Sequence, residues 1–303
     1  ANVITLNMSR IIQDWARKER VGRDYLKGHF FELGDSFVEY LVDILERVYC
    51  YQTAYKERLY NLERHGMLTA SNAGYISMDR LYSTIGVNGV NEAAEFVGLE
   101  CRYNEPYKRF CRLVTGTISR QNKLHSRKGF LFNQEFVPAE SLSSKNYNWD
   151  RDDGYWVPDD RVLYNSYFYK ADDPETGVLE KFLLHGREFT ELLDGGVGLH
   201  CNLAEHLSRE QYLKLIDFAI ENGTSYFTFN VPNSECTNKD CHYIVKLPMD
   251  TCPRCGAPMN QFTRIIGYLR PVKDFDRFRR IEAGRRFYAP AEEVVEDKRV
   301  FPR

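Results

Sequence analysis

Apolar and polar positions along the chain follow two different periods, and each segment keeps to one of them. Residues 1–8 form a β-branched apolar run, which predicts a buried strand. Over residues 36–65 apolar side chains recur every three or four positions, so one long amphipathic helix is predicted, ending at Gly66. Residues 81–95 predict a strand, a glycine turn and a helix capped near Asn91, where the turn is either a ligand cradle or a plain connection.

The middle of the chain is less periodic. Residues 104–130 are basic and follow a helical pattern, whereas residues 142–160 are rich in Ser, Asn, Asp and Trp and predict an exposed loop. Residues 163–169 form an aromatic run that predicts another buried strand.

The next segments return to a clear alternation of helix and strand. Residues 208–222 predict a helix because Ser208 and Gln211 form a capping box and Gly223 suits a helix end. Residues 226–231 predict the strand that follows. Strands that alternate with helices indicate an α/β fold, either layered or a barrel.

Composition narrows the classes of partner. The 303 residues carry 41 basic and 43 acidic side chains and a net charge of −2, so we expect no nucleic-acid partner. No apolar run reaches the roughly 20 residues of a membrane span, so we expect no membrane partner either. One basic cluster near the C-terminus is predicted to be the solvated face of a tail helix, with a binding patch as the alternative: Lys273, Arg277, Arg279, Arg280, Arg285 and Arg286.

Four of the eight cysteines are paired in sequence. Cys236 and Cys241 form a C-x4-C pair, and Cys252 and Cys255 form a C-x2-C pair shortly after it. Four thiolates favour tetrahedral zinc and leave no open position for a substrate, so a structural zinc ribbon is predicted. Two disulfides, buried thiols, or His242 as a substitute ligand are the alternatives.

The other cysteines show no paired spacing, and no secretory segment precedes them: Cys50, Cys101, Cys111 and Cys201. Unpaired cysteines are typical of a reducing compartment, which predicts a cytoplasmic protein. Cys201 lies near several glycines and is either a redox thiol or, as we favour, an ordinary buried cysteine.

Gly267 stands in an apolar, strand-like segment where a β-branched residue is expected. One interpretation is a bulge or a close backbone contact. The other is a glycyl radical, because loss of a hydrogen from Cα leaves a planar carbon that only glycine can accommodate without a clash from Cβ.

The chain resembles the C-terminal half of anaerobic (class III) ribonucleoside-triphosphate reductases. The resemblance rests first on Cys252-Pro-Arg-Cys255-Gly and on Arg264-Ile-Ile-Gly267-Tyr-Leu-Arg-Pro-Val. Further matches follow in family order along nearly the whole chain: Val3-Ile-Thr-Leu-Asn7-Met-Ser-Arg, Thr84-Ile-Gly-Val-Asn-Gly-Val-Asn-Glu-Ala, Val137-Pro-Ala-Glu140-Ser141 and Tyr164-Asn165-Ser166.

The resemblance implies a fold and a division of the chain. We expect the second half of a ten-stranded α/β barrel of the glycyl-radical and ribonucleotide reductase type, with a small C-terminal zinc ribbon. Residues 1–230 would form the partial catalytic barrel, residues 231–258 the ribbon, and residues 259–303 the glycyl-radical loop and C-terminal segment. The family's thiyl cysteine has no match before Cys50, so a missing N-terminal portion is expected to supply it.

The resemblance also implies a mechanism. A radical-SAM activating enzyme would take a hydrogen atom from Gly267. The glycyl radical would then oxidise the family's thiyl cysteine, which stands on a loop inside the barrel. The thiyl would then abstract the ribose 3′ hydrogen of a ribonucleotide. Asn7, Glu140 and Ser141 would line the substrate side, where a carboxyl group can deliver the proton that a leaving hydroxyl needs. Taken from the residues alone, Glu140 is equally an N-cap or surface charge, and Asn7 a buried structural amide.

The implied partners are the ribonucleotide, the N-terminal half of the reductase in the same or a separate chain, the activating enzyme, and a second copy in a homodimer. By itself the chain is expected to be inactive. Two other functions stay open: a different glycyl-radical enzyme, or a non-catalytic interaction module built on the zinc ribbon.

Overall fold

A computed structural model describes residues 2–136, 141–170, 173–264 and 268–296 of the chain. The fold is mixed α/β, as predicted, and its contacts divide the chain into two compact units. Each unit is assembled from separate stretches of sequence: unit 1 from Ala1–Glu100, Asn104–Val137 and Glu191–Val197, and unit 2 from Cys101–Tyr103, Pro138–Thr190 and Gly198–Arg303.

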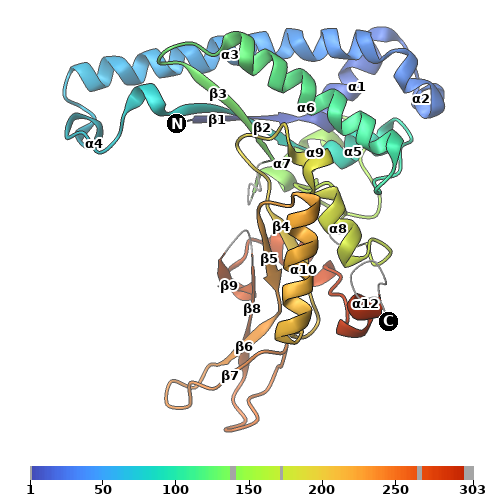
Figure 1. Cartoon of the computed structure of the whole chain (residues 1–303), viewed down its shortest axis with the longest axis vertical. Helices are drawn as coiled ribbons and strands as arrows, with labels where there is room; N and C mark the ends of the chain where they lie inside the picture. The colour runs from blue at the N-terminus through green and yellow to red at the C-terminus, as the bar shows by residue number, and fades with distance from the viewer. Residues whose placement is uncertain (1, 137–140, 171–172, 265–267, 297–303) are drawn as a thin grey trace. The chain divides into compact units, whose positions relative to one another are not determined.

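Unit 1 is built on a sheet of three parallel strands in the order β1-β2-β3 (Figure 1). Parallel neighbours need long crossover connections, which here are helical. The elements of unit 1 in chain order are β1 Asn2–Asn7, α1 Met8–Glu19, α2 Arg23–His29, η1 Phe30–Glu32, α3 Gly34–Arg64, α4 Thr69–Asn72, η2 Met78–Arg80, β2 Tyr82–Asn88, α5 Val90–Phe96, α6 Glu105–His125 and β3 Leu131–Phe136.

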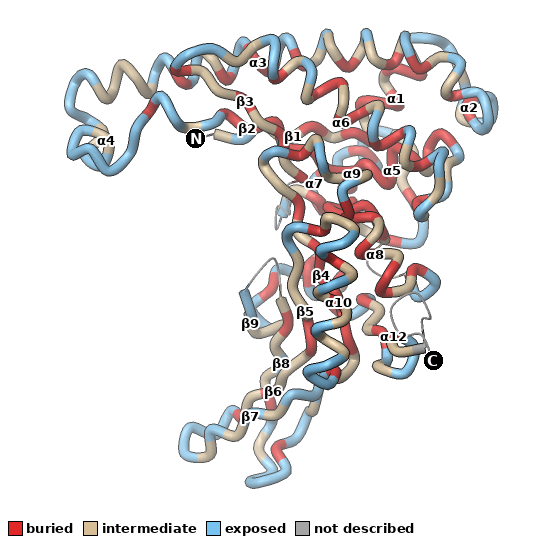
Figure 2. Tube along the Cα trace, in the orientation of Figure 1, coloured by how far each residue is buried: buried red, intermediate tan, exposed pale blue. Residues whose placement is uncertain are grey.

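The core of unit 1 lies between the sheet and its helices. Helix α3 buries one face, with Phe37, Leu41, Leu45 and Val48 recurring at the helical spacing, and exposes the opposite face (Figure 2). The strand predicted over residues 1–8 and the helix predicted over 36–65 are thus confirmed to within two residues at each end. The predicted burial of the strand is wrong, because Leu6 is the one buried residue of β1. The central strand β2 is buried along almost its whole length, as expected for a parallel strand between two others.

The outer edge of β3 is covered by residues 191–197. Gly196 forms a parallel bridge with Glu135, and the N–H of Gly195 donates to the carbonyl of Gln134 at 2.8 Å. A Cβ at position 195 would lie only 2.7 Å from that carbonyl oxygen, so the close approach requires glycine. The segment therefore protects a sheet edge that would otherwise be open.

Unit 2 contains two small sheets. Strands β4 and β5 are parallel and joined through α10, and four antiparallel strands follow in the order β7-β6-β8-β9. The elements of unit 2 are α7 Leu142–Asp152, α8 Val178–Leu184, α9 Arg187–Thr190, β4 Leu199–Asn202, α10 Arg209–Asn222, β5 Phe227–Asn230, β6 Asn233–Cys236, β7 Ile244–Val245, β8 Met259–Arg264, β9 Leu269–Pro271, η3 Val272–Asp274, α11 Arg277–Arg285 and α12 Ala291–Glu296.

The predicted helix over 208–222 is confirmed together with both of its ends. Ser208 accepts from the Gln211 N–H at 3.2 Å, and the Ser208 N–H donates to the Gln211 side chain at 2.7 Å. Gly223 ends the helix with a left-handed φ of 73°. The strand predicted over 226–231 is also present, as β5.

Two predictions for the middle of the chain are wrong. The supposed exposed loop over 142–160 begins with helix α7, because a polar face of Ser143, Ser144 and Asn146 is buried and makes internal hydrogen bonds. The supposed strand over 163–169 is buried but irregular. Its aromatic run signalled burial rather than strand pairing.

Smaller differences concern element ends. The helix expected over 104–130 stops at His125, and β3 follows it at Leu131. Helix α5 is capped by Gly89, and Asn91 lies buried inside it, where its side chain accepts from the Tyr107 hydroxyl at 2.8 Å. Across the described ranges, no helix combines the length and the apolar character needed to cross a bilayer.

Candidate functional site

The four paired cysteines converge in space within unit 2. The sulfurs of Cys236, Cys241, Cys252 and Cys255 all lie within 4.8 Å of one another. Cys236 and Cys255 are 3.4 Å apart at sulfur, and Cys241 and Cys252 are 3.8 Å apart. All four thiols are unbridged, which excludes the disulfide alternative because a disulfide brings two sulfurs to about 2.05 Å.

Tight turns present these sulfurs to a common point. The Gly256 N–H donates to the Cys252 carbonyl at 2.9 Å, and Gly256 has a left-handed φ of 73° that closes the second turn. In the first turn the Asn238 N–H donates to the Cys236 sulfur at 3.4 Å. His242 also has a left-handed backbone, with φ of 49°, but the converging group consists of the four cysteines.

The donor set fits a zinc ion. Four sulfurs at zinc–sulfur distances of 2.3 Å in a tetrahedron lie about 3.8 Å from each other, close to the separations seen here. Burial disfavours the Cys252 thiolate, but N–H groups of Arg254 and Cys255 donate to it and lower the pKa of Cys252 to about 7. One metal-binding thiolate is therefore readily formed near neutral pH.

Strand β8 connects this four-thiol cluster to the segment that contains Gly267. Cys236 at the end of β6 is paired with Met259 at the start of β8. Five residues later, Arg264 at the end of β8 is paired with Leu269 in β9. Gly267 lies between these two residues in sequence but outside the described residues. Six strand residues span about 17 Å, so the cluster lies too far from this hairpin end to touch it.

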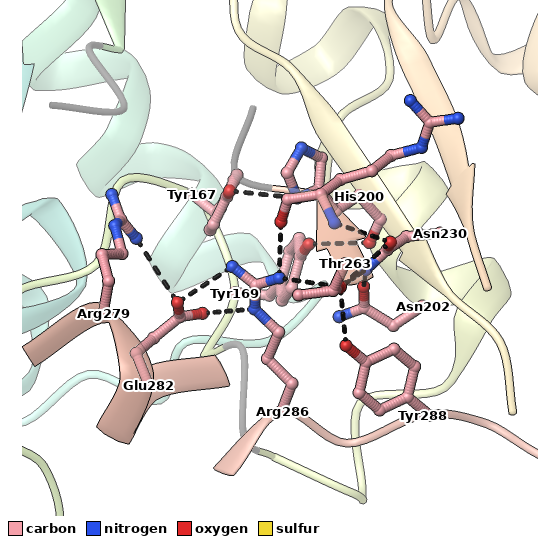
Figure 3. Close-up of polar contacts among 11 residues, drawn as sticks. Tyr167, Tyr169, His200, Asn202, Asn230, Thr263, Arg279, Glu282, Arg286 and Tyr288 are labelled. Atoms are coloured by element: carbon pink, nitrogen blue, oxygen red, sulfur yellow. Dashed lines mark hydrogen bonds and ion pairs between the residues drawn. The ribbon is translucent and has the colours of Figure 1, made fainter. Parts of the chain in front are cut away.

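Polar side chains surround the end of β8 (Figure 3). Asn230, the last residue of β5, is fully buried, and its Nδ2 donates to Oδ1 of Asn202 at 2.7 Å and to Oγ1 of Thr263 at 3.0 Å. The hydroxyls of Thr263 and Tyr288 are 3.0 Å apart. This group links two separate sheets of unit 2 at the residue before Arg264.

The basic tail helix is only partly solvated, which corrects the sequence prediction. Three of its arginines are exposed: Arg277, Arg280 and Arg285. The other two, Arg279 and Arg286, are buried beside Glu282. Burial alone would raise the pKa of the Glu282 carboxyl, yet the charges and hydrogen bonds of its two arginine neighbours hold that pKa below its usual range. The one acidic residue within the helix is what permits two cations to be buried.

The carboxyl ends of the three parallel strands in unit 1 lie at one edge of the sheet. Asn7 ends β1 and is paired with Asn88, which ends β2, and Val87 is paired with Phe136, which ends β3. Asn7 also caps α1, because its Oδ1 accepts from the Arg10 N–H at 3.2 Å. The predicted amide is thus both a structural cap and a member of the strand-end edge, where ligands bind in many α/β sheets.

The predicted residue Ser141 lies just before α7 and is exposed, without a side-chain capping bond. Its neighbour in the prediction, Glu140, falls outside the described residues. Helix α7, which follows Ser141, contacts the matched segment Tyr164–Ser166. The Tyr164 N–H donates to the Ser143 carbonyl at 3.2 Å, and the Ser143 and Ser166 hydroxyls are 3.3 Å apart. Two stretches that are separate in sequence are therefore packed together inside unit 2.

Sequence reasoning missed several members of these sites. Asn88 carried a usable signal, since it is an asparagine at the end of a predicted strand, as Asn7 is. Asn230, Glu282 and Arg286 carried none, because their roles depend on elements far apart in sequence. Cys201 is buried and burial raises its thiol pKa to about 12, which supports an ordinary core cysteine.

Comparison with known proteins gives one consistent family. Residues 1–288 match the family model of the anaerobic ribonucleoside-triphosphate reductases. No curated protein matches the chain.

Solved structures agree with this match. An anaerobic ribonucleotide reductase superimposes with a TM-score of 0.81 at 27% identity, covering 95% of this chain and 45% of its own. The anaerobic ribonucleotide reductase from Thermotoga maritima, in complex with dATP and CTP, gives 0.76 at 27% identity over 92% of this chain and 44% of its own. The same enzyme with glycerol in the active site gives 0.75. This chain thus spans less than half the length of these relatives.

Proposed function

Because this chain belongs to the family of anaerobic ribonucleoside-triphosphate reductases, we propose that it forms part of a glycyl-radical enzyme that makes deoxyribonucleotides from ribonucleotides. The observation that carries the proposal is the family match over residues 1–288, joined to solved anaerobic reductases that cover most of the chain. A match of this extent favours ribonucleotide reduction over other glycyl-radical reactions. It also disfavours a non-catalytic ribbon module, since the ribbon is a small part of the matched region.

We propose that residues 1–230 contribute to a ten-stranded α/β barrel that is completed by a portion outside the chain. The parallel order β1-β2-β3 and the parallel pair β4-β5 support this architecture. Residues 231–258 would then be the zinc ribbon, and residues 259–303 the radical loop and C-terminal segment. The second half of the barrel alone would be inactive, because the thiyl cysteine would lie in the other half.

The four-thiol cluster is proposed to hold zinc in a closed, structural site. A zinc ion there would cross-link the turns that follow β6 and precede β8, and its four-sulfur shell would leave no position for substrate. Cys236 and Met259 are paired directly beside these turns, which supports a role in fixing the start of β8. The cluster would therefore act on the radical hairpin through the strand and not by direct contact.

Gly267 is the proposed site of the radical. A radical-SAM activating enzyme would remove one of its two α hydrogens, and the remaining one would split the electron resonance into a doublet. The pairing of Arg264 with Leu269 supports the proposal, because it holds the strand residues on either side of position 267 in register. The radical would take a hydrogen atom from the thiyl cysteine's S–H, and the thiyl would then abstract the ribose 3′ hydrogen.

Asn7, Glu140 and Ser141 are proposed to line the substrate side. A carboxylic acid such as Glu140 would supply the proton with which the 2′ hydroxyl leaves as water. The family match over residues 1–288, which includes all three residues, supports this assignment. The complete enzyme would be a cytoplasmic homodimer that binds the ribonucleotide and, transiently, the activating enzyme.

The decisive experiment is anaerobic activation followed by electron resonance and a deoxyribonucleotide assay. The protein, supplied with its N-terminal half and a radical-SAM activase, should give a doublet and form deoxyribonucleotides from ribonucleotides. Gly267→Ala should lose both signals. A doublet of unchanged intensity in Gly267→Ala rejects the radical site, and a doublet without any deoxyribonucleotide product favours a different glycyl-radical reaction.

A further inference from the structure

Both main-chain groups of Arg264, the last residue of β8, are hydrogen-bonded by side chains. Its N–H donates to Oδ1 of Asn230 at 3.1 Å, and its carbonyl accepts from Nη1 of Arg286 at 2.7 Å. The register of β6 with β8 ends at Phe262, two residues before Arg264. Asn230 and Arg286 take the place of a neighbouring strand at this point.

The orientation of Asn230 is fixed by its other contacts. Its Nδ2 donates to Asn202 and to Thr263, which leaves Oδ1 directed at the Arg264 N–H and at the Thr263 hydroxyl, 3.2 Å away. The side chain is fully buried, so water does not compete for these bonds. An amide held in this way is a rigid anchor between β5 and the end of β8 (Figure 3).

The orientation of Arg286 is fixed by Glu282. Arg286 Nε and Nη2 donate to the two carboxylate oxygens of Glu282 at 2.7 and 2.9 Å, which leaves Nη1 for the Arg264 carbonyl. The exposed fractions of the two side chains are 2% and 8%, so the pair is shielded from water. A buried ion pair adds little net stability compared with apolar residues of similar size. The hydrogen bond that it directs at Arg264 is the better explanation of its presence.

We propose that Asn230 and Arg286 are positioning residues for the radical-bearing connection, and that Glu282 orients Arg286. We name these three residues the Arg264 clamp. The inference rests on the proposed radical at Gly267. Arg264 and Leu269 form the last pair of β8 and β9, and Gly267 follows Arg264 by three residues. Hydrogen-atom transfer requires the donor and acceptor atoms to be held in close contact, so both the activase and the thiol depend on where this pair is held.

The test uses the full chain with the double substitution Glu282→Leu/Arg286→Met. All proteins compared in this test, the otherwise unmodified protein included, carry Arg279→Met, because Arg279 is a second buried cation 3.5 Å from Glu282 and would lose its carboxylate neighbour. On this background the double substitution abolishes the bond to Arg264 and leaves no buried carboxylate behind. A matched control is Glu210→Leu/Lys214→Met, an exposed pair in α10 with the same spacing and a separation of 3.6 Å. Arg286→Lys is a second, milder variant, since lysine keeps the charge but loses the forked geometry.

Two readouts separate positioning from folding. Hydrogen exchange of the β8 and β9 amides should become about tenfold faster in the double variant, as expected when one buried bond to a charged group is lost, while zinc content stays unchanged. After activation the spin count of the doublet should fall by about tenfold, with Arg286→Lys intermediate and the control unaltered.

The outcomes distinguish the clamp from the function it rests on. An unmodified protein that gives no doublet overturns the proposed function, while the exchange measurement still tests the clamp. Exchange and spin count that both equal those of the unmodified protein overturn the clamp. Faster exchange with a full spin count also overturns the positioning role, because the bonds would then be structural only. If the double variant does not fold, Arg286→Lys carries the same comparison.

Discussion

Asn7 and Asn88 are register partners at the carboxyl ends of two parallel strands. Side chains of paired residues in parallel strands point to the same face of the sheet, so two amides are presented together at this edge. One of them, Asn7, also caps the helix that follows. Substitutions at Asn7 can therefore separate its role as the cap of α1 from its proposed role at the substrate.

Asn7→Asp should keep the fold and lose activity. The carboxylate still accepts from the Arg10 N–H, but the amide donor is gone, so the turnover of the complete enzyme should fall at least tenfold if Asn7 contacts ribose. Asn7→Ala should in addition lower the free energy of unfolding by about 1 kcal/mol.

Asn104→Ala is the matched control for these variants. Asn104 caps α6 by accepting from the Tyr107 N–H at 2.9 Å, and it belongs to none of the three strands of unit 1. Asn104→Ala should lower the free energy of unfolding by about as much as Asn7→Ala does, and the complete enzyme should keep its full turnover. Equal losses of turnover in Asn104→Ala and Asn7→Ala would show that Asn7 is only a cap.

Removal of the metal should release the ribbon and leave unit 1 folded. The unmodified protein, prepared without oxygen, should contain one zinc per chain, and Cys255→Ser should contain much less, because a structural site needs all four ligands. Such sites contribute about 10–16 kcal/mol of metal-binding free energy to local folding, so a chelator should expose the β6 and β8 amides to exchange. Cys50→Ser, an exposed cysteine of α3, should leave the metal count unchanged. Full zinc in Cys255→Ser would contradict the site.

His185 should make unit 2 less stable as the pH falls below about 6.5. Burial is the main reason that its pKa is lowered to about 3, the charge of His200 lowers it further, and its hydrogen bond to the Lys181 carbonyl opposes the shift only in part. The unfolded chain therefore binds a proton at a higher pH than the folded chain does. The stability from neutral His185 is complete above the unfolded pKa and is lost progressively as the pH falls from about 6.5 to about 3.

Thermal unfolding between pH 7 and pH 5 measures this effect. His185→Leu should flatten the pH dependence, because the aromatic residues around the ring, Tyr167, Phe168 and Tyr169, accept an apolar side chain. His65→Gln, at an exposed histidine, should leave the slope unchanged. A slope in His185→Leu as steep as in the unmodified protein would assign the effect to other groups.

Gly195→Ala should destabilise unit 1. The new Cβ would lie 2.7 Å from the Gln134 carbonyl oxygen, and relief of that clash should cost about 1–3 kcal/mol of unfolding free energy. Gly22→Ala is the control, because a Cβ there has no neighbour within 4 Å, and its effect should stay within about 0.5 kcal/mol. Denaturant unfolding measures both, and equal midpoints would show that the segment can move aside.

The parts of the fold that were predictable are those in which one element determines its own pattern. The period of α3 and the capping box of α10 are local signals, and both were read correctly. The run over 163–169 was misread because aromatic burial is common to strands and to irregular core segments, and only tertiary contacts distinguish them. Helix α7 was missed since its buried face is polar, which a hydrophobic pattern does not register.

The candidate site divides in the same way. The four-thiol cluster was predictable because a metal dictates short spacings between its ligands. The partners of Arg264 were not, since Asn230 and Arg286 lie 34 and 22 residues from it and are ordinary residue types. Arg286 was predicted to be exposed, because the basic residues around it in sequence outnumber Glu282, the one carboxylate with which it pairs.

The interleaving of the chain limits how this protein can be dissected. Unit 1 recruits Glu191–Val197 from beyond a long stretch of unit 2, so no single cut in the gene isolates either unit intact. A truncation after Val137 would remove Gly196, which pairs with Glu135 at the edge of β3. The exposed strand edge could then pair with a second copy of the protein. Any engineered minimal version must splice that short stretch back in, and recombination between relatives is constrained to exchange both pieces together.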